Sequence, residues 1–250
     1  ERAVETQRPD ALFTDPFAAQ LAGQEAIEAA IPKLEKYEKD GRPFVPVRTR
    51  FFDDFLNKYS NNVRQVVLLG SGMDARAFRL NWQLGTHIYE IDHPDVLLYK
   101  ESILNSTSPN CIRHSICADL KESLWTELLV KEGYKSSEPT IWLLEGFLYY
   151  LNSVEAENIL KNIQSLSVKG SYLGADVVNT VVCNGSDEWA KYWQFGCDDP
   201  ESFFATYAWK ASAIQPGEEG ASFGRFTYQL PAHNIPDSPH IFFVLAIKED

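Results

Sequence analysis

The chain has 250 residues and a formal net charge of −12, from 23 basic and 35 acidic residues. This length suits one large domain or two small ones, and 6 tryptophans, 11 tyrosines and 15 phenylalanines can fill a sizeable core. The acidic balance argues against nucleic acids and anionic membranes as partners, because both attract basic proteins. It also repels anionic small molecules at long range, so a site for an acid needs a locally placed Arg or Lys.

The cysteines and histidines show no ligand or disulfide pattern. Cys111, Cys117, Cys183 and Cys197 lack C-x-x-C spacing, which is typical of free thiols in a cytoplasmic protein. The five histidines have no metal-ligand spacing, so we expect no metal site. No apolar run reaches the ~18 residues that cross a membrane. No signal peptide is visible, although the sequence begins at Glu1 without a methionine.

Helices interrupted by prolines are predicted over residues 1–60, and the 41–46 stretch is a candidate hinge. The clearest helix covers about 47–59, where Phe51, Phe52 and Phe55 recur at helical spacing. From Val63 onward, short apolar strands alternate with helices. The predicted strands cover about 64–69, 86–91, 112–116, 140–144, 172–178 and 241–247. The predicted helices cover about 73–80, a segment after Pro94, about 121–132, and a segment that Asn152 and Glu155 begin with a capping box.

This alternation predicts an α/β fold with a doubly wound, mostly parallel sheet covered on both faces. We expect a single domain over residues 1–250, with four parts. The parts are a helical cap (1–60), a cofactor-binding core (61–182), a covering elaboration inserted near the C-terminus (183–236) and a final strand (237–250).

A glycine turn follows the first predicted strand, with Gly70 at the end of an apolar run and Gly72 two residues later. Together with Ala75 and Asp92 it matches the dinucleotide fingerprint, in which glycines admit a ligand to the backbone and an acid holds ribose hydroxyls. The same turn serves S-adenosylmethionine, and the carboxylate of Asp74 competes with a pyrophosphate for the helix N-terminus. A plain tight loop is a third interpretation.

Carboxylates close three consecutive predicted strands: Asp92, Asp119 and Glu145. The carboxyl ends of parallel strands meet at one edge of a sheet, where ligands of such folds bind. Asp119 and Glu145 have no task in nicotinamide binding, whereas the adenine amino group and the methionine ammonium group both need acceptors. The pattern therefore favours S-adenosylmethionine over NAD.

Five motifs follow one another in a fixed order between Val47 and Leu151. They are Val47-Arg48-Thr49-Arg50-Phe51-Phe52-Asp53-Asp54, Leu69-Gly70-Ser71-Gly72-Met73-Asp74-Ala75-Arg76, Tyr89-Glu90-Ile91-Asp92, Ala118-Asp119-Leu120 and Trp142-Leu143-Leu144-Glu145-Gly146-Phe147-Leu148-Tyr149-Tyr150-Leu151. The set resembles the leucine carboxyl methyltransferase family of S-adenosylmethionine-dependent O-methyltransferases, and Asp15-Pro16-Phe17 with Gly224-Arg225 resembles its bacterial branch. The resemblance implies a class I, Rossmann-like methyltransferase fold.

The resemblance also implies roles for individual residues. At the methionine end, Arg48, with Arg50 as the alternate, would pair with the carboxylate, and Glu145 would meet the amino group. At the nucleoside end, Asp92, with Glu90 as second choice, would hold the ribose, and Asp119 with Leu120 would frame the adenine. Gly70 and Gly72 would approach the cofactor, and Tyr150 would face the transfer site. Arg2 falls near a basic position of the family, but its spacing is off. Both arginines could instead be surface residues of an amphipathic helix, the acids could be helix caps, and Tyr149 reads as core.

Methyl transfer from a sulfonium is an in-line displacement, and a carboxylate acceptor, whose usual pKa is about 4, is already ionised near neutral pH. Such an acceptor needs no general base, which fits a sequence without a Ser-His-Asp set. We therefore expect an O-methyltransferase of secondary metabolism that acts on a carboxylate or hydroxyl of a natural-product-like small molecule. Arg225 is the candidate for meeting a substrate carboxylate.

A crowd of aromatic residues could line an apolar substrate pocket or form the core of the covering part. They are Trp189, Tyr192, Trp193, Phe195, Phe203, Phe204, Tyr207 and Trp209. Two other functions remain open: an NAD(P)-dependent oxidoreductase, disfavoured because the tyrosines considered lack a lysine four residues on, and a non-catalytic S-adenosylmethionine-binding protein. The sequence does not indicate an oligomeric state.

Overall fold

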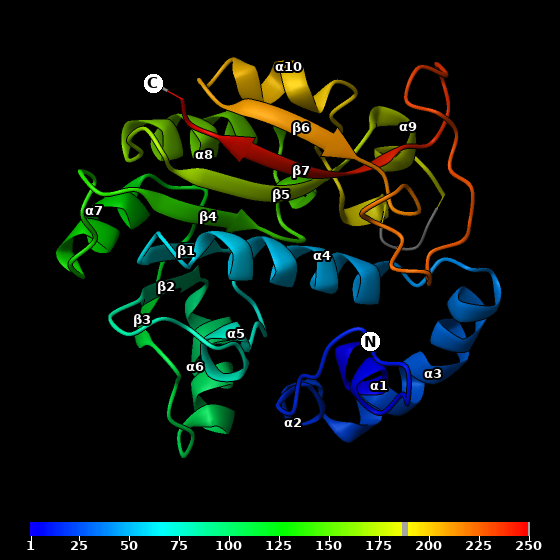
Figure 1. Cartoon of the computed structure of the whole chain (residues 1–250), viewed down its shortest axis with the longest axis horizontal. Helices are drawn as coiled ribbons and strands as arrows, with labels where there is room; N and C mark the ends of the chain where they lie inside the picture. Colours follow the sequence, from blue (N-terminus) through cyan, green and yellow to red (C-terminus); the bar gives the residue numbers. More distant parts are fainter. Residues whose placement is uncertain (187–189, 250) are drawn as a thin grey trace.

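The computed structural model describes residues 1–186 and 190–249. Trp189 of the predicted aromatic crowd therefore lies outside the described residues. A seven-stranded sheet forms the centre of the molecule, in the order β3-β2-β1-β4-β5-β7-β6 (Figure 1). Its strands are β1 (Gln65–Leu69), β2 (His87–Asp92), β3 (Ile112–Cys117), β4 (Thr140–Leu144), β5 (Tyr172–Val178), β6 (Lys210–Ile214) and β7 (Ile241–Ile247).

Strands β1 to β5 pair in parallel, whereas β7 runs antiparallel to both β5 and β6. The chain order reverses between β1 and β4, which places a switch point beside the glycine turn after β1. The fold class predicted from the alternating pattern, a mostly parallel Rossmann-like sheet, is confirmed.

Helices cover both faces of the sheet, because successive strand residues point to opposite sides. In β1, Val66 and Leu68 join one core cluster, and Val67 and Leu69 join the other. The first cluster packs against α4 (Phe44–Tyr59), α5 (Arg76–Arg79) and α6 (Pro94–Leu104). The second packs against α7 (Leu124–Lys131), α8 (Ser153–Ser165) and α10 (Pro200–Ala205). Each buried aliphatic side chain in these layers contributes about 1.5–3 kcal/mol.

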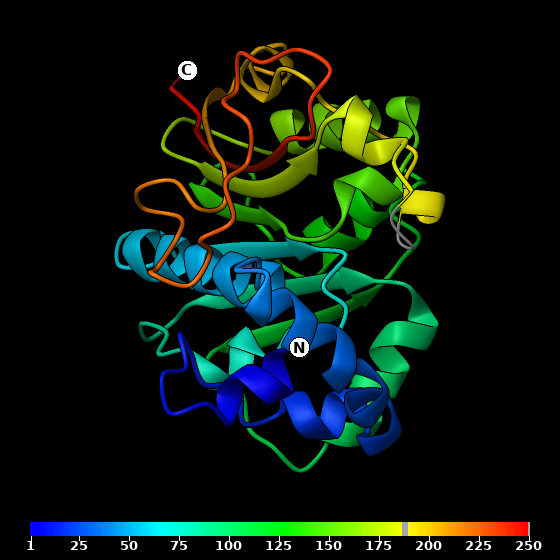
Figure 2. The ribbon, with the colours of Figure 1, turned by 90° about the vertical axis from the view of Figure 1, so that its right-hand side faces the viewer.

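The predicted helix over 47–59 begins earlier, at Phe44, and it belongs to the layer against the sheet. Phe52, Phe55 and Leu56 are fully or almost fully buried there. The other N-terminal helices, α1 (Arg2–Thr6), α2 (Ala18–Ala22) and α3 (Gln24–Lys39), lie beyond the carboxyl ends of the parallel strands (Figures 1 and 2). Residues 1–60 therefore supply both a sheet-covering helix and a group of helices over the strand ends.

The 183–236 segment is expected only to cover the sheet, but it also supplies a strand, β6, at the edge of the sheet. No strand is predicted there from the sequence, since Lys210-Ala211-Ser212-Ala213 is short and poor in β-branched residues. The remaining short elements are η1 (Leu148–Tyr150), α9 (Thr180–Cys183) and η2 (Ala190–Tyr192). The capping box at Asn152 and Glu155 is present as predicted. In the described ranges, 1–186 and 190–249, no helix combines the length and apolarity needed to span a membrane.

Candidate functional site

The turn after β1 forms an open cradle at the end of the sheet. Both glycines have positive φ angles, 67° at Gly70 and 46° at Gly72, which L side chains rarely adopt. A Cβ at Gly70 would lie 2.6 Å from the ring of Phe147, so a side chain there has no room. A Cβ at Gly72 would meet nothing closer than the Gly70 carbonyl oxygen at 3.9 Å. The space over Gly72 is therefore free for a ligand.

Asp92, at the end of β2, holds this turn. One carboxylate oxygen accepts a hydrogen bond from the Gly72 N–H at 2.6 Å, and the other accepts one from the His93 N–H at 2.7 Å. A carboxylate has further lone pairs, so Asp92 can still accept hydrogen bonds from hydroxyl groups. Asp119 follows β3 at the same edge, where its half-exposed carboxylate lies 3.7 Å from His93 Nε2. Leu120 beside it is buried in the core.

A cavity of about 210 Å³ opens over the cradle. The glycine turn forms one wall, and Arg48, Glu145 and Gly146 form another. Arg2 closes the cavity, with its guanidinium donating to the Met73 carbonyl and to Asp15. The structure thus brings Arg2, whose spacing in the sequence is off, to the same site as Arg48.

Arg48 projects from α4 into a buried cluster of acids. Its Nε donates to Glu145 at 3.1 Å, and its Nη1 donates to Asp176 at 2.9 Å and to the Tyr149 hydroxyl at 3.0 Å. Asp176 is fully buried and also accepts from the Gly146 N–H at 2.6 Å. These partners come from three different elements, so Arg48 joins α4 to the ends of β4 and β5.

Glu145 lies between two arginines. Burial by itself would raise the pKa of Glu145, but Arg76 and Arg48 outweigh it and lower that pKa below the usual value. The Oε2 atom lies 2.6 Å from Arg76 Nη1 without hydrogen-bond geometry, and it is buried without a hydrogen-bond partner among the described residues. An ionised carboxylate with one oxygen that accepts no hydrogen bond suits a cationic ligand group such as an ammonium.

Three residues of this cluster escaped the sequence analysis. Tyr149 reads as core, yet its hydroxyl joins Arg48 and Asp176, and burial with the nearby Asp176 charge raises its pKa well above the usual value. The phenol is therefore a protonated hydrogen-bond donor. Burial also raises the pKa of Asp176. The sequence feature that could have revealed Asp176 is a single carboxylate within the apolar strand 172–178. For Arg76, that feature is a basic residue two positions after Asp74.

The structure places two of the predicted cofactor-binding residues, Glu90 and Arg50, away from this edge. Glu90 is fully buried, and one carboxylate oxygen binds both Lys100 and Arg113 at 2.7 Å. Arg50 pairs with Asp54 on the solvent side of α4 at 2.9 Å. The ribose role for Glu90 and the alternate cofactor role for Arg50 therefore find no support in this geometry.

Arg225 also lies elsewhere. Its guanidinium binds Glu38 at 2.5 Å and Glu5 at 3.3 Å, and Asp10 lies 3.7 Å away. These carboxylates already offset its charge, and it is absent from the walls of both cavities at the strand ends. The expectation that Arg225 meets a substrate carboxylate finds no support in this geometry, in which the residue joins the covering segment to the N-terminal part of the chain.

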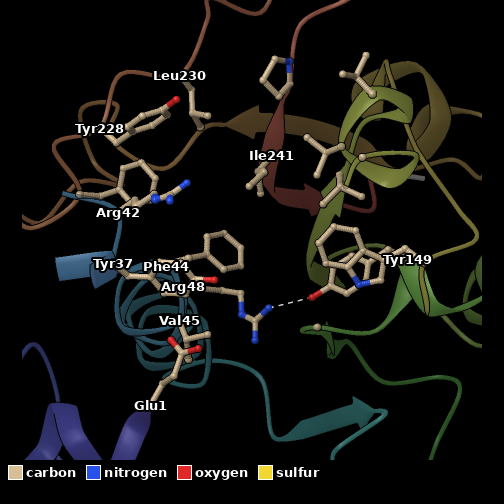
Figure 3. Close-up of a pocket in the computed structure, with 18 of the residues that line it drawn as sticks. Glu1, Tyr37, Arg42, Phe44, Val45, Arg48, Tyr149, Tyr228, Leu230 and Ile241 are labelled. Carbon is tan, nitrogen blue, oxygen red and sulfur yellow. Dashed lines mark hydrogen bonds between the residues drawn. The ribbon is translucent and has the colours of Figure 1, made fainter. Parts of the chain in front are cut away.

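A second cavity, of about 650 Å³, adjoins the first and shares Arg48 and Gly146 with it. Figure 3 shows Arg48 reaching toward Tyr149 across its floor, with Tyr37, Phe44 and Tyr228 on the opposite wall. Tyr150 lines this cavity and is 38% exposed. Of the predicted aromatic crowd, Trp193 lines it, while Phe195, Phe204, Tyr207 and Trp209 are buried in the core. Its walls are mostly apolar, which suits a small organic molecule.

A protein-family model identifies the family of this chain. The family model for leucine carboxyl methyltransferase matches residues 1–164, which is more than half of the chain. The chain belongs to the leucine carboxyl methyltransferase family. This confirms the family resemblance found in the sequence motifs.

Two relatives carry the name "Putative S-adenosyl-L-methionine-dependent methyltransferase". One, from Streptomyces coelicolor, is 34% identical over 251 residues, covering 93% of this chain and 87% of the relative. The other, from Parafrankia sp., is 42% identical over 184 residues, covering 70% of this chain and 59% of its own length. A solved structure from Thermobifida fusca, titled as a "putative methyltransferase", superposes with a TM-score of 0.60 at 14% identity and covers 98% of this chain and 96% of that one.

The family member described here is thus an S-adenosylmethionine-dependent methyltransferase. The nicotinamide and non-catalytic alternatives are not favoured. The residues present suit the cofactor: the Glu145 oxygen that accepts no hydrogen bond suits an ammonium group, and the open cradle at Gly72 suits a nucleoside. We propose that Arg48 binds the methionine carboxylate, Glu145 the ammonium group, Asp92 the ribose hydroxyls, and Asp119 with Leu120 the adenine.

The two glycines offer a matched test of the cradle. Alanine at either position incurs about 1–2 kcal/mol of left-handed backbone strain. At Gly72 the added methyl group projects into the open space, so we expect Gly72→Ala to weaken S-adenosylhomocysteine binding at least about tenfold. At Gly70 the methyl group meets Phe147, so Gly70→Ala mainly lowers the midpoint of urea unfolding. Calorimetry measures the affinity for S-adenosylhomocysteine, and urea unfolding measures the stability. If the ratio of lost affinity to lost stability were the same in both variants, the assignment of the space at Gly72 to the cofactor would be contradicted.

Proposed function

We propose that this methyltransferase is an O-methyltransferase that methylates a carboxylate of a small molecule bound in the 650 Å³ cavity. The observation that carries the proposal is that this cavity shares Arg48 and Gly146 with the cavity over the glycine cradle. An acceptor in the larger cavity and a cofactor in the smaller one would therefore meet beside these two residues. A hydroxyl acceptor is the alternative.

The lack of a strong general base among the described residues at this junction supports a carboxylate. Among the described residues there, Glu145 and Asp176 both bind Arg48, and Tyr149 is protonated. A carboxylate is already ionised near neutral pH and needs no base, whereas a hydroxyl must lose a proton during the reaction.

Bound S-adenosylmethionine would supply a sulfonium-activated methyl group, with a neutral thioether as the leaving group. The protein's part is to hold the two partners in line and to exclude water from the acceptor. Tyr149 and Tyr150 line the larger cavity next to the junction, and the Tyr149 hydroxyl accepts from Arg48 and donates to Asp176, which fixes the ring at the cavity wall. The apolar walls remove water that would otherwise solvate a carboxylate nucleophile.

A binding and turnover experiment tests this proposal. We expect S-adenosylhomocysteine to bind with a Kd of roughly micromolar size, and NAD not to bind in the same calorimetric titration. With S-adenosylmethionine present, a panel of apolar carboxylic acids should give methyl esters detected by mass spectrometry. Methyl ethers from the matching alcohols and phenols, with no esters, would reverse the choice of acceptor. Binding without any turnover would overturn the proposed reaction.

A further inference from the structure

The larger cavity contains a second arginine, Arg42, which has no part in the cofactor site. Arg42 lies between α3 and α4 and lines the cavity, whereas it is absent from the walls of the smaller one. Figure 3 shows it on the wall opposite Tyr149, beside Phe44 and below Tyr228. A molecule that fills the cavity would therefore have one end at Tyr149 and the other at Arg42.

Two aromatic rings flank the Arg42 side chain, and backbone hydrogen bonds at the preceding residue hold this part of the chain in place. Its guanidinium carbon lies 5.4 Å from the centroid of the Tyr37 ring and 5.9 Å from that of Tyr228. The neighbouring Gly41 carbonyl accepts hydrogen bonds from the N–H groups of Thr227 and Tyr228, at 2.7 and 2.9 Å. A guanidinium between aromatic faces keeps its charge while losing conformational freedom. The planar donor group is thus fixed at the cavity wall before any ligand arrives.

Arg42 retains donors that a ligand can use. Its ion pair is with Asp40, at 3.1 Å, and the two side chains are 41% and 36% exposed. Such an exposed pair is weak, and it leaves other N–H groups of the guanidinium available. Arg42 Nε is buried and donates to no described residue. Arg48, the other arginine among the described residues of this cavity wall, pairs with Glu145 and Asp176 within 3.1 Å and is the arginine that we propose for the methionine carboxylate.

From these contacts we infer that the substrate carries two acidic groups at opposite ends of an apolar body. One carboxylate lies at the junction with Gly146 and receives the methyl group; the other anionic group binds Arg42. This rests on the proposed carboxylate methylation and adds the class of acceptor. It also accounts for how a chain of net charge −12 retains an anion, since a local guanidinium overcomes the long-range repulsion.

A series of α,ω-diacids, from adipate to tetradecanedioate, tests the inference without assuming the length of the substrate. Each diacid is compared with its own monomethyl ester, which has the same body and one carboxylate. Methyl transfer from S-adenosylmethionine is measured as kcat/KM, because a monoester reacts only when its carboxylate lies at the junction and its ester lies at Arg42. At the best length we expect kcat/KM of the diacid to exceed that of its monoester at least tenfold, and this ratio to shrink as salt concentration rises.

Arg42→Gln removes the proposed anchor. In this variant we expect the diacid-to-monoester ratio to fall to about two, the statistical factor that remains because a diacid has two equivalent ends. Arg42→Lys keeps a positive charge and should retain part of the preference. The matched control is Arg50→Gln, because Arg50 also stacks on an aromatic ring, Phe223 at 5.3 Å, and pairs with one exposed carboxylate, but lies outside the cavity. The control should keep the wild-type ratio, and both variants should bind S-adenosylhomocysteine as the wild type does.

Equal kcat/KM for diacid and monoester at every length, or an unchanged ratio in Arg42→Gln, would overturn the inference. Both results leave the proposed reaction standing if monoacids are still converted to methyl esters. A protein that does not bind S-adenosylhomocysteine would instead refute the cofactor assignment, so the two failures are distinguishable.

Discussion

Arg48→Met is expected to weaken S-adenosylhomocysteine binding about 100-fold, because charge-assisted hydrogen bonds to the methionine carboxylate are lost. The same change should lower the free energy of unfolding by about 3–5 kcal/mol, because it leaves the buried carboxylate of Asp176 without its counter-charge. Calorimetry and urea denaturation measure the two effects separately.

Arg50→Met is the matched control on the same helix. Arg50 and Asp54 form an exposed i,i+4 pair with side chains 39% and 48% exposed, so its loss should reduce stability by less than about 1 kcal/mol. It should also leave the affinity for S-adenosylhomocysteine unchanged. If the two variants lose affinity equally, the structural separation of Arg48 from Arg50 has no functional meaning, and the alternate role predicted for Arg50 returns.

The sequence predicts the centre of this fold well because its strands are short apolar runs between helices. The run Thr140–Leu144 is buried along its whole length, and its boundaries match the prediction residue for residue. The edge strand β6 carries no comparable signal, since only one neighbour pairs with it and none of its five residues is fully buried. Edge strands of this composition are specified by tertiary pairing more than by local pattern.

The candidate site was predictable where an acid or glycine ends a strand, and less so where charges meet across the fold. Glu90 and Asp92 differ by two positions on one strand, yet Lys100 and Arg113 bind only the first. Arg225 looked available because its partners, Glu5 and Glu38, lie about 190 to 220 residues earlier in the chain. Pairing of charges over such distances is set by packing, which a single sequence does not reveal.

Arg76→Met is expected to lower the free energy of unfolding by about 3–5 kcal/mol near neutral pH. Arg76 is 3% exposed, and its guanidinium contacts three carboxylates, those of Asp53, Asp74 and Glu145. Removing it leaves these buried charges with fewer counter-charges. Lys161→Met, which breaks an exposed pair with Glu157, is the control and should cost less than about 1 kcal/mol.

The pH dependence of this cost has a definite sign. Burial would raise the pKa of Asp74 and that of Glu145, but Arg76 and other cations lower both below their usual values. Groups with a lowered pKa in the folded state stabilise the protein above their unfolded pKa, and this contribution is lost as the pH falls through the folded pKa. Without Arg76, burial dominates and both carboxyl groups bind protons more readily in the folded state. The cost of Arg76→Met should therefore be largest near neutral pH and shrink toward about pH 4.5, near the usual carboxyl range. Urea titrations at both pH values measure it, and an equal cost at each would show that Arg76 acts through packing alone.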